Sequence, residues 1–306
     1  MAQRPGEKRA RMQRRGPLRS PARKIAERAA ARGAHTRSAT DAGEDAAGLD
    51  APSQKLHKLL AQNGLGSRRA MEEWIREGKI TVNGAIATIG ARVQQSDVIR
   101  VGRKVIRWPS TSRVPRVLLY HKPEGEIVSH DDPEGRSSVF DQLPGLRGAK
   151  WLAVGRLDYN TSGLLIFTTS GELANRMMHP RFAVEREYAV RIVGVLTSAQ
   201  IARLENGIEL VDGVASFISV RDEGGEGTNH WYRIVLREGR NRVVRRMFEA
   251  LGLTVSRLMR VRFGVVELPP RLKRGQVSAL PAAEVKHLLA WLEENAPELP
   301  QSVPPA

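Results

Sequence analysis

The sequence predicts an α+β fold, with a small N-terminal domain followed by a larger one. Its 306 residues are enough for two domains and a sizeable core. Short apolar runs typical of buried strands alternate with amphipathic stretches of helix length, without the regular strand–helix–strand repeat of a parallel sheet. A stretch at 104–114 that contains Pro, Ser and Thr is predicted to be the linker between the two domains.

The first 52 residues are predicted to be a disordered tail. They contain no Phe, Trp or Tyr, so they cannot bury enough apolar surface to offset the cost of ordering. The first 37 residues carry 12 Lys or Arg and 2 Glu, whereas positions 41–50 hold 4 acids and no base. The basic part is interpreted either as a phosphate-binding arm or as a solubilising tail. Its composition also resembles an organellar transit peptide, although it has no clear amphipathic helix.

Residues 53–103 are predicted to form the small domain, from two helices and a hairpin. The first helix is expected to end at Asn63, before Gly64, and Ser67 is the predicted N-cap of a second helix that runs to Glu77. Residues 80–84 alternate and then turn. The side chains predicted to face the core of this domain are Leu56, Leu59, Leu60, Met71, Trp74 and Ile75.

The larger domain is predicted over 115–295. Its expected strands cover 116–120, 151–155, 163–168, 186–193 and 231–237, and its expected helices lie near 171–178, 198–206 and 241–251. A last amphipathic helix is predicted from the spacing of Val285, Leu288, Leu289 and Leu292. Residues 296–306 are rich in Pro and are predicted to be a flexible tail.

One acid is placed in a polar loop between two of these strands. Asp158 lies in the segment GRLDYNTSG (155–163), which follows one apolar run and precedes another. The pattern predicts a carboxylate presented on a loop. A second interpretation is that Asp158 only hydrogen-bonds the backbone of its own turn, as Asp before Asn, Ser and Gly often does.

Composition restricts the partners and the chemistry. The formal net charge of +16 favours a polyanionic partner, because clustered Lys and Arg release counterions from a phosphate backbone. The absence of Cys excludes disulfides, thiolate catalysis and Cys-based zinc sites, and the 7 His residues form no ligand-spaced pair. There is no phosphate-binding loop of the GxxxxGK[ST] type and no apolar run of membrane-spanning length. We therefore expect no bound metal, no cofactor and no membrane association.

The residues around Asp158 resemble a known motif. GRLD (155–158) followed by TSGLL (161–165) is similar to the catalytic motif of RNA pseudouridine synthases. The similarity continues over about 115–280, through KPEG (122–125), GELANRMMHP (171–180), EYAV (187–190), EGRNR (238–242) and VRRMF (244–248). In the small domain, LGSRR (65–69) and KITVNG (79–84) resemble the S4 RNA-binding domain. The resemblance implies an S4 domain of ααβ order and a catalytic domain with a mixed, largely antiparallel sheet.

The resemblance also implies a substrate. DDPEGR (131–136), VFD (139–141) and GAKW (148–151) look most like members of the S4-containing branch that act on 23S ribosomal RNA. A 16S-specific enzyme is the nearest alternative, and a noncatalytic RNA-binding factor of ribosome assembly is the alternative from another class. We expect a cytoplasmic monomer that acts without a cofactor on ribosomal RNA, as part of a subunit assembly intermediate.

Carried over residue by residue, the resemblance implies three catalytic residues. Asp158 is the expected catalytic carboxylate, and Tyr188 is expected to pack its ring against the flipped uracil. Arg245 is the expected cation partner of Asp158, since a carboxylate in a dry pocket stays ionised only near a positive charge. Arg242, Arg245 and Arg246 are predicted to share one charged face of the helix at 241–251. The alternatives are that Tyr188 is a core aromatic residue and that all three arginines bind phosphate or solvent.

Further residues are expected to contact RNA. Arg156 and Leu258 are predicted to bind the substrate nucleotide, and Arg242 its phosphate. In the S4 domain, Arg68 and Arg69 begin a helix whose N–H groups already favour an anion. The complete set predicted to bind RNA there is Lys55, Lys58, Arg68, Arg69 and Lys79. One departure from the family pattern is Val243, where relatives usually carry Gln or Glu.

Overall fold

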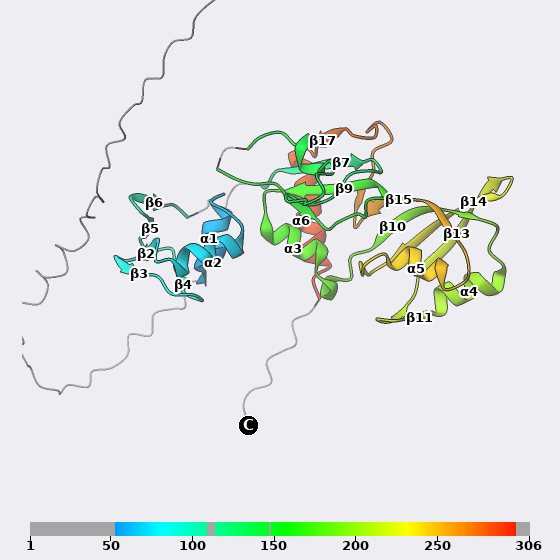
Figure 1. Ribbon diagram of the computed structural model, residues 1–306, viewed down its shortest axis with the longest axis horizontal. Coiled ribbons are helices and arrows are strands. Elements are labelled where there is room, and N and C mark those ends of the chain that lie inside the picture. Colours follow the sequence, from blue (N-terminus) through cyan, green and yellow to red (C-terminus); the bar gives the residue numbers. More distant parts are fainter. Residues whose placement is uncertain (1–52, 109–113, 147, 298–306) are drawn as a thin grey trace, which may run out of the picture. The chain divides into compact units, whose positions relative to one another are not determined.

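The computed structural model describes residues 53–108, 114–146 and 148–297 (Figure 1). The tail predicted over 1–52 and the last nine residues of the predicted C-terminal tail lie outside the described residues. Within the described residues, no helix is both long enough and apolar enough to span a bilayer.

The S4-like domain has its apolar residues where the sequence predicts them. Its elements are β1 (Gln54–Lys55), α1 (Leu56–Gln62), α2 (Arg68–Arg76), β2 (Ile80–Val82), β3 (Ala85–Ile86), β4 (Arg92–Val93), β5 (Ile99–Val101) and β6 (Lys104–Ile106). Ser67 caps α2 as predicted, because its hydroxyl accepts a hydrogen bond from the Ala70 N–H at 3.0 Å. Asn83 and Gly84 both have positive φ, as a two-residue hairpin turn between β2 and β3 requires.

The predicted boundary between this domain and the linker is wrong by several residues. Residues 104–106, assigned to the linker, form β6, which pairs with β5 through a turn at Gly102. Ile106 is 5 % exposed and joins the same core as Leu56 and Met71. The polar and basic residues around this strand conceal it in the sequence, and only pairing along β5 shows that 104–106 complete the sheet.

The larger domain is built on one twisted sheet with the strand order β13-β14-β10-β15-β9-β7-β17 (Figure 1). Its strands are β7 (Val117–Lys122), β8 (Leu152–Val154), β9 (Ser162–Thr168), β10 (Arg186–Val193), β13 (Ser219–Glu226), β14 (Asn229–Leu236), β15 (Val255–Phe263), β16 (Val266–Glu267) and β17 (Val277–Ala279). β15 pairs with β9 in parallel, and the other strand pairs of this sheet are antiparallel. A separate hairpin is formed by β11 (Ile208–Leu210) and β12 (Gly213–Ala215).

Helices pack on both faces of the sheet. They are α3 (Gly171–Met178), α4 (Ser198–Asn206), α5 (Val243–Glu249) and α6 (Ala282–Glu294), with short 3-10 turns at Val139–Gln142 and Pro180–Phe182. One core contains residues of α4 and α5, and the other contains residues of α3 and α6. In β9, Leu165 and Phe167 belong to the first core and Leu164 and Ile166 to the second. The strand that follows the Asp158 loop is therefore buried on both faces.

The predicted α+β class is confirmed, and helices 171–178 and 198–206 match α3 and α4 residue for residue. In the larger domain, the strands that the sequence analysis did not predict are β13, β15, β16 and β17 of the large sheet and the hairpin strands β11 and β12. β15 lies in the middle of the sheet, but its three arginines interrupt the apolar pattern by which buried strands are recognised. Helix α5 begins at Val243 and not at 241, because Arg242 has a φ of 49° and lies outside the helix.

Candidate active site

Asp158 lies on the loop that connects β8 to β9, as the sequence predicts. The loop begins at Gly155, whose φ is 81°. Leu157 points into the core, Asp158 is half-buried, and Arg156 is exposed. The Thr161 N–H donates to the Asp158 carbonyl oxygen at 3.0 Å, which closes a turn around the acid. No hydrogen bond or ion pair within 4.0 Å joins the Asp158 carboxylate to another described residue, so the carboxylate is open to a ligand.

Lys122, the last residue of β7, binds the backbone of this loop. Its side chain is completely buried. The ammonium group donates to the carbonyl oxygens of Thr161 at 3.0 Å and Tyr159 at 3.5 Å, and to that of Pro123 at 2.8 Å. The three donors of the ammonium group are thus directed at backbone carbonyls, two of them in the loop.

Arg245 holds the remaining carbonyl of the same stretch. Its Nη2 donates to the Asn160 carbonyl oxygen at 2.7 Å, and its Nη1 donates to that of Val255 at 2.9 Å. The expected direct pair with Asp158 is not formed in the described residues, since no ion pair within 4.0 Å joins the two groups. Lys122 and Arg245 together bind the carbonyls of 159, 160 and 161, and so fix the backbone that presents the acid.

Both cations are buried near acids that keep them charged. Burial lowers the pKa of Lys122 to about 8, against the opposing effect of the negative charges of Glu126, Asp158 and Glu124. Burial also lowers the pKa of the Arg245 guanidinium, helped by the positive charge of Arg242, and the charge of Asp158 acts in the opposite direction. Arg245 therefore interacts with the field of Asp158 although its hydrogen bonds go to the backbone.

Strand register aligns further residues with this loop. Tyr188 in β10 is opposite Arg260 in β15, Arg260 is opposite Gly163 in β9, and Gly163 is opposite Lys122 in β7. A Cβ atom on Gly163 would lie 2.2 Å from the Arg260 carbonyl oxygen, so only glycine permits this close approach of β9 to β15. One row across four strands therefore carries Tyr188, Arg260, Gly163 and Lys122, and Gly163 lies five residues after Asp158 in the sequence.

The other predicted substrate contacts have different surroundings. Leu258 is 4 % exposed and belongs to the same buried cluster as Leu157 and Tyr188. Arg242 is exposed, with Glu249 at 3.3 Å. Arg246, which the sequence placed beside Arg245 on one charged helix face, instead makes a two-pronged ion pair with Asp212 at 2.8 and 2.9 Å.

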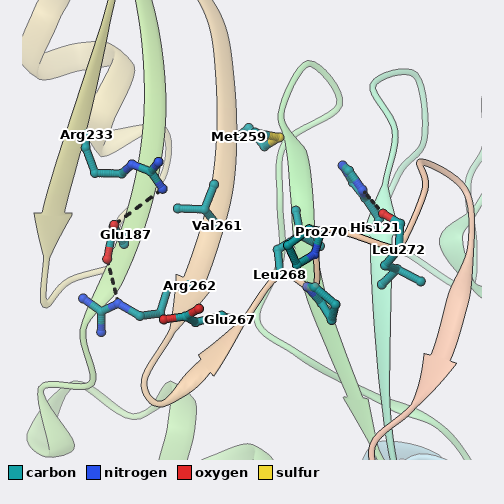
Figure 2. A pocket seen from close by; sticks show the side chains of 11 residues that line it. His121, Glu187, Arg233, Met259, Val261, Arg262, Glu267, Leu268, Pro270 and Leu272 are labelled. Atoms are coloured by element: carbon teal, nitrogen blue, oxygen red, sulfur yellow. Dashed lines mark hydrogen bonds and ion pairs between the residues drawn. The ribbon is translucent and has the colours of Figure 1, made fainter. Parts of the chain in front are cut away.

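A cavity of about 310 Å³ lies elsewhere on the sheet (Figure 2). Its lining includes His121, Met259 and Glu187, but none of the predicted catalytic residues. Glu187 precedes Tyr188 in β10 and so points to the opposite face of the sheet. Figure 2 shows Glu187 between Arg262, at 2.7 Å, and Arg233, at 3.6 Å. Arg262 is also paired with Glu185 at 3.3 Å and Arg233 with Glu223 at 3.1 Å, so neither arginine that lines the cavity is free to bind a phosphate.

Comparison with known proteins identifies the family. The model of RNA pseudouridylate synthases matches residues 116–250, and the S4 domain model matches residues 54–99. A protein of Pseudomonas aeruginosa named ribosomal large subunit pseudouridine synthase B is 53 % identical over 234 residues, which are 76 % of this chain and 61 % of that protein. The proteins of the same name from Salmonella typhimurium and Escherichia coli K12 are each 50 % identical over 244 residues, 79 % of this chain and 84 % of theirs. The chain belongs to the RNA pseudouridylate synthase family.

A solved structure agrees with this membership. A crystal structure of a pseudouridylate synthase aligns with a TM-score of 0.54 at 26 % sequence identity, and the alignment covers 76 % of this chain and 99 % of that one. This chain spans about three fifths of the length of the Pseudomonas relative. The predicted family and the predicted S4 domain are both confirmed.

The basic residues predicted to bind RNA in the S4 domain differ in their exposure and in whether an acid already pairs with them. Arg68 and Arg69 are exposed in the first turn of α2, and neither forms an ion pair with another described residue. Lys79 is paired with Glu77 and lies 5.9 Å from the Trp74 ring. The exposed Lys55 and the half-buried Lys58 lie in β1 and α1 respectively.

Sequence reasoning missed two residues of the site, Lys122 and Arg260. Lys122 begins the KPEG motif (122–125), but the sequence analysis assigned it no function, and it did not consider Arg260. A local signal could have found both, because side chains two positions apart in a strand point to the same face of the sheet. Lys122 is two residues after the buried Tyr120 in β7, and Arg260 is two residues after the buried Leu258 in β15. Among the described residues, no group of three His, Asp or Glu is placed to hold a metal ion.

Lys122→Met is expected to change the pH dependence of stability. The pKa of Lys122 is lowered to about 8 in the folded chain, below the roughly 10.4 of an unfolded lysine. Between these values the unfolded chain binds more protons than the folded one, so the contribution of Lys122 to the free energy of unfolding rises with pH. Urea denaturation measures the free energy of unfolding of both proteins. The value for the wild type minus the value for the variant should be more positive at about pH 10 than at about pH 7.5. An equal difference at both pH values would contradict the lowered pKa.

Proposed function

We propose that this chain converts a specific uridine of 23S ribosomal RNA to pseudouridine, with Asp158 as the catalytic carboxylate. One observation carries the proposal. The Asp158 carboxylate has no bonding partner among the described residues, while Lys122 and Arg245 hold the three carbonyls that follow it. An acid that served only its own turn would bond the turn with its side chain, whereas here the backbone is fixed by other groups and the carboxylate is left available.

The arrangement suits an isomerisation. Formation of pseudouridine breaks the bond from N1 of uracil to the ribose, rotates the base and joins the ribose to C5. No electrons are gained or lost overall and no group leaves, so the reaction needs neither a cofactor nor an energy source. It does need a carboxylate that acts on a nucleotide flipped out of its stack. Asp158 supplies that group, and the fixed loop places it.

The neighbouring residues have supporting roles in this proposal. The Tyr188 ring packs against the flipped uracil, and stacking of this kind contributes about 1–3 kcal/mol per base. Leu258 forms part of the apolar wall beside Tyr188. Arg156 is exposed in the Asp158 loop, where it can bind the phosphate of the flipped nucleotide or occupy the space that the base leaves. Arg242, exposed before α5, adds a phosphate contact.

The proposed partner is ribosomal RNA in an assembling large subunit. We propose that the enzyme acts on it in the cytoplasm, as a monomer. The relatives named large subunit pseudouridine synthases support the choice of 23S over 16S RNA. The net charge of +16 supports an RNA partner of either kind.

The test is to incubate the purified chain with unmodified 23S and 16S transcripts and map pseudouridines by carbodiimide labelling and primer extension. We expect one modified uridine in 23S RNA and none in 16S RNA. Modification of 16S RNA alone would favour the small-subunit alternative. Tight RNA binding without any pseudouridine in either transcript would favour the noncatalytic assembly factor.

Arg68→Gln combined with Arg69→Gln is expected to weaken RNA binding and to reduce its salt dependence. Each lost phosphate contact removes about 0.7–0.9 from the slope of log affinity against log salt. Binding of a 23S fragment at several salt concentrations measures that slope. The matched control is Arg76→Gln in the same helix, because Arg76 is already paired with Glu73. Equal slopes for the double variant and the wild type would exclude both arginines from the RNA interface.

A further inference from the structure

Besides Arg245, two other buried arginines of the catalytic domain have no carboxylate partner among the described residues. Arg260 is 2 % exposed and Arg186 is 8 % exposed. Within the described chain, no Asp or Glu forms an ion pair within 4.0 Å of either guanidinium. Arg186 donates to the carbonyl oxygens of Val184 at 3.3 Å and Arg237 at 3.0 Å. A buried charge without a counter-ion lowers stability unless other groups compensate it, so the position of Arg260 beside the site calls for a reason.

Arg260 contacts the strand and the loop that carry the predicted catalytic acid. Its Nε donates to the Leu164 carbonyl oxygen in β9 at 2.8 Å. Its Nη1 lies 4.0 Å from the point where a Cβ atom of Gly155 would be, at the start of the Asp158 loop. The guanidinium carbon is 4.8 Å from the centre of the Phe263 ring. These contacts restrict the orientation of the guanidinium, and its buried Nη2 has no hydrogen-bond partner among the described residues.

Arg260 and Tyr188 are neighbours across two paired strands. The two residues are directly opposite on β15 and β10, and side chains opposite each other on adjacent strands share a face. Tyr188 is 9 % exposed, so its phenol is almost completely enclosed. Burial lowers the pKa of the Arg260 guanidinium, and the neighbouring Tyr188 hydroxyl opposes that shift.

We propose that Arg260 is a positioning residue that fixes the Tyr188 ring relative to the Asp158 loop. Its guanidinium binds the Tyr188 phenol oxygen and the Leu164 carbonyl oxygen together, and so ties β10 to β9. The role in the reaction rests on the proposed function, in which Tyr188 contacts the flipped uracil. A base that has left its ribose must be turned without being lost, and a ring that shifts by about 1 Å can cost about 10²-fold in rate.

Arginine suits this task better than lysine. Its planar fork presents several donors in fixed directions, whereas a lysine ammonium is a single point on a flexible stem. Arg260→Lys therefore keeps the positive charge and loses the simultaneous contacts. The competing explanation is that Arg260 only joins β15 to β9 through Leu164, and in that case the Tyr188 hydroxyl has no part in its effect.

A double-mutant cycle separates the two explanations. In single-turnover reactions at saturating RNA, Arg260→Lys is expected to lower the rate about tenfold with RNA affinity unchanged. Added to Tyr188→Phe, the same substitution is expected to have little further effect, because the phenol oxygen is already absent. If the rate losses of the two single variants multiply in the double variant, Arg260 acts independently of Tyr188 and the proposal is wrong.

A second readout does not depend on activity. The full chain contains 4 tyrosines, so ¹³C-tyrosine labelling gives a simple spectrum in which Tyr188→Phe identifies the Tyr188 signal. That signal should move in Arg260→Lys and stay in Arg262→Lys, a control on the same strand whose Nε donates to Glu187 at 2.7 Å. Arg260→Gln replaces Arg260→Lys if the latter does not fold. An unmoved Tyr188 signal overturns the proposal. The two proposals can fail separately. If the Tyr188 signal moves but the wild-type chain forms no pseudouridine, the proposed function is wrong and the Arg260–Tyr188 contact is established.

Discussion

Asp158→Asn is expected to abolish pseudouridine formation and to leave RNA affinity within about twofold of wild type. The substitution removes the ionised carboxylate but keeps the size of the side chain. It breaks no hydrogen bond or ion pair to another described residue, so the fold and the positions of Lys122 and Arg245 should persist. Single-turnover assays with 23S RNA measure the rate, and filter binding measures the affinity.

Asp131→Asn is the matched control for this variant. Asp131 is also an acid in a loop of the catalytic domain, and its side chain is exposed. We expect this control to react at the wild-type rate. Measurable turnover by Asp158→Asn would remove Asp158 from the catalytic role.

Arg245→Met is expected to reduce the chemical step by about 10²-fold and to change RNA affinity little. The buried guanidinium donates to the carbonyl oxygens of Asn160 and Val255, and methionine leaves both without that donor. The loop then loses one of the two cations that hold it, and Asp158 loses a nearby positive charge. Single-turnover rates at saturating RNA isolate this effect from binding.

Arg242→Met, the matched control, should behave differently. Arg242 lies only three residues before Arg245, but it is exposed and near Glu249. Its loss should mainly weaken RNA binding, and the defect should shrink at low salt, where the remaining phosphate contacts bind more strongly. Equal defects in both variants that are rescued by low salt would reduce Arg245 to one more phosphate ligand.

Local patterns in the sequence predicted the helices, because the residues that define a helix are close together in the chain. The apolar spacing of α3 and α4 gave their bounds, and Ser67 gave the start of α2, because helix caps and helix faces depend on residues three or four apart. The position of Asp158 between two strands also followed from local pattern. β15 and β6 were missed, because their charged residues conceal strands that only pairing with distant partners reveals.

The roles of the cations required the tertiary structure. The sequence placed Arg242, Arg245 and Arg246 on one charged surface of a helix, yet one is exposed before the helix, one binds the Asp158 loop and one binds Asp212. These differences arise from the direction of each side chain after packing, which spacing alone does not give.

The sequence by itself determined the family, the two-domain order and the loop that carries Asp158, because each of these is written in contiguous motifs. Only the tertiary structure brought Lys122, from a strand about 40 residues upstream, and Arg260, from one about 100 residues downstream, to that loop and to Tyr188. The physical reason is the register of the sheet. Hydrogen bonding between β10, β15, β9 and β7 aligns residues that are far apart in the chain, and no local pattern records which residues will be opposite one another.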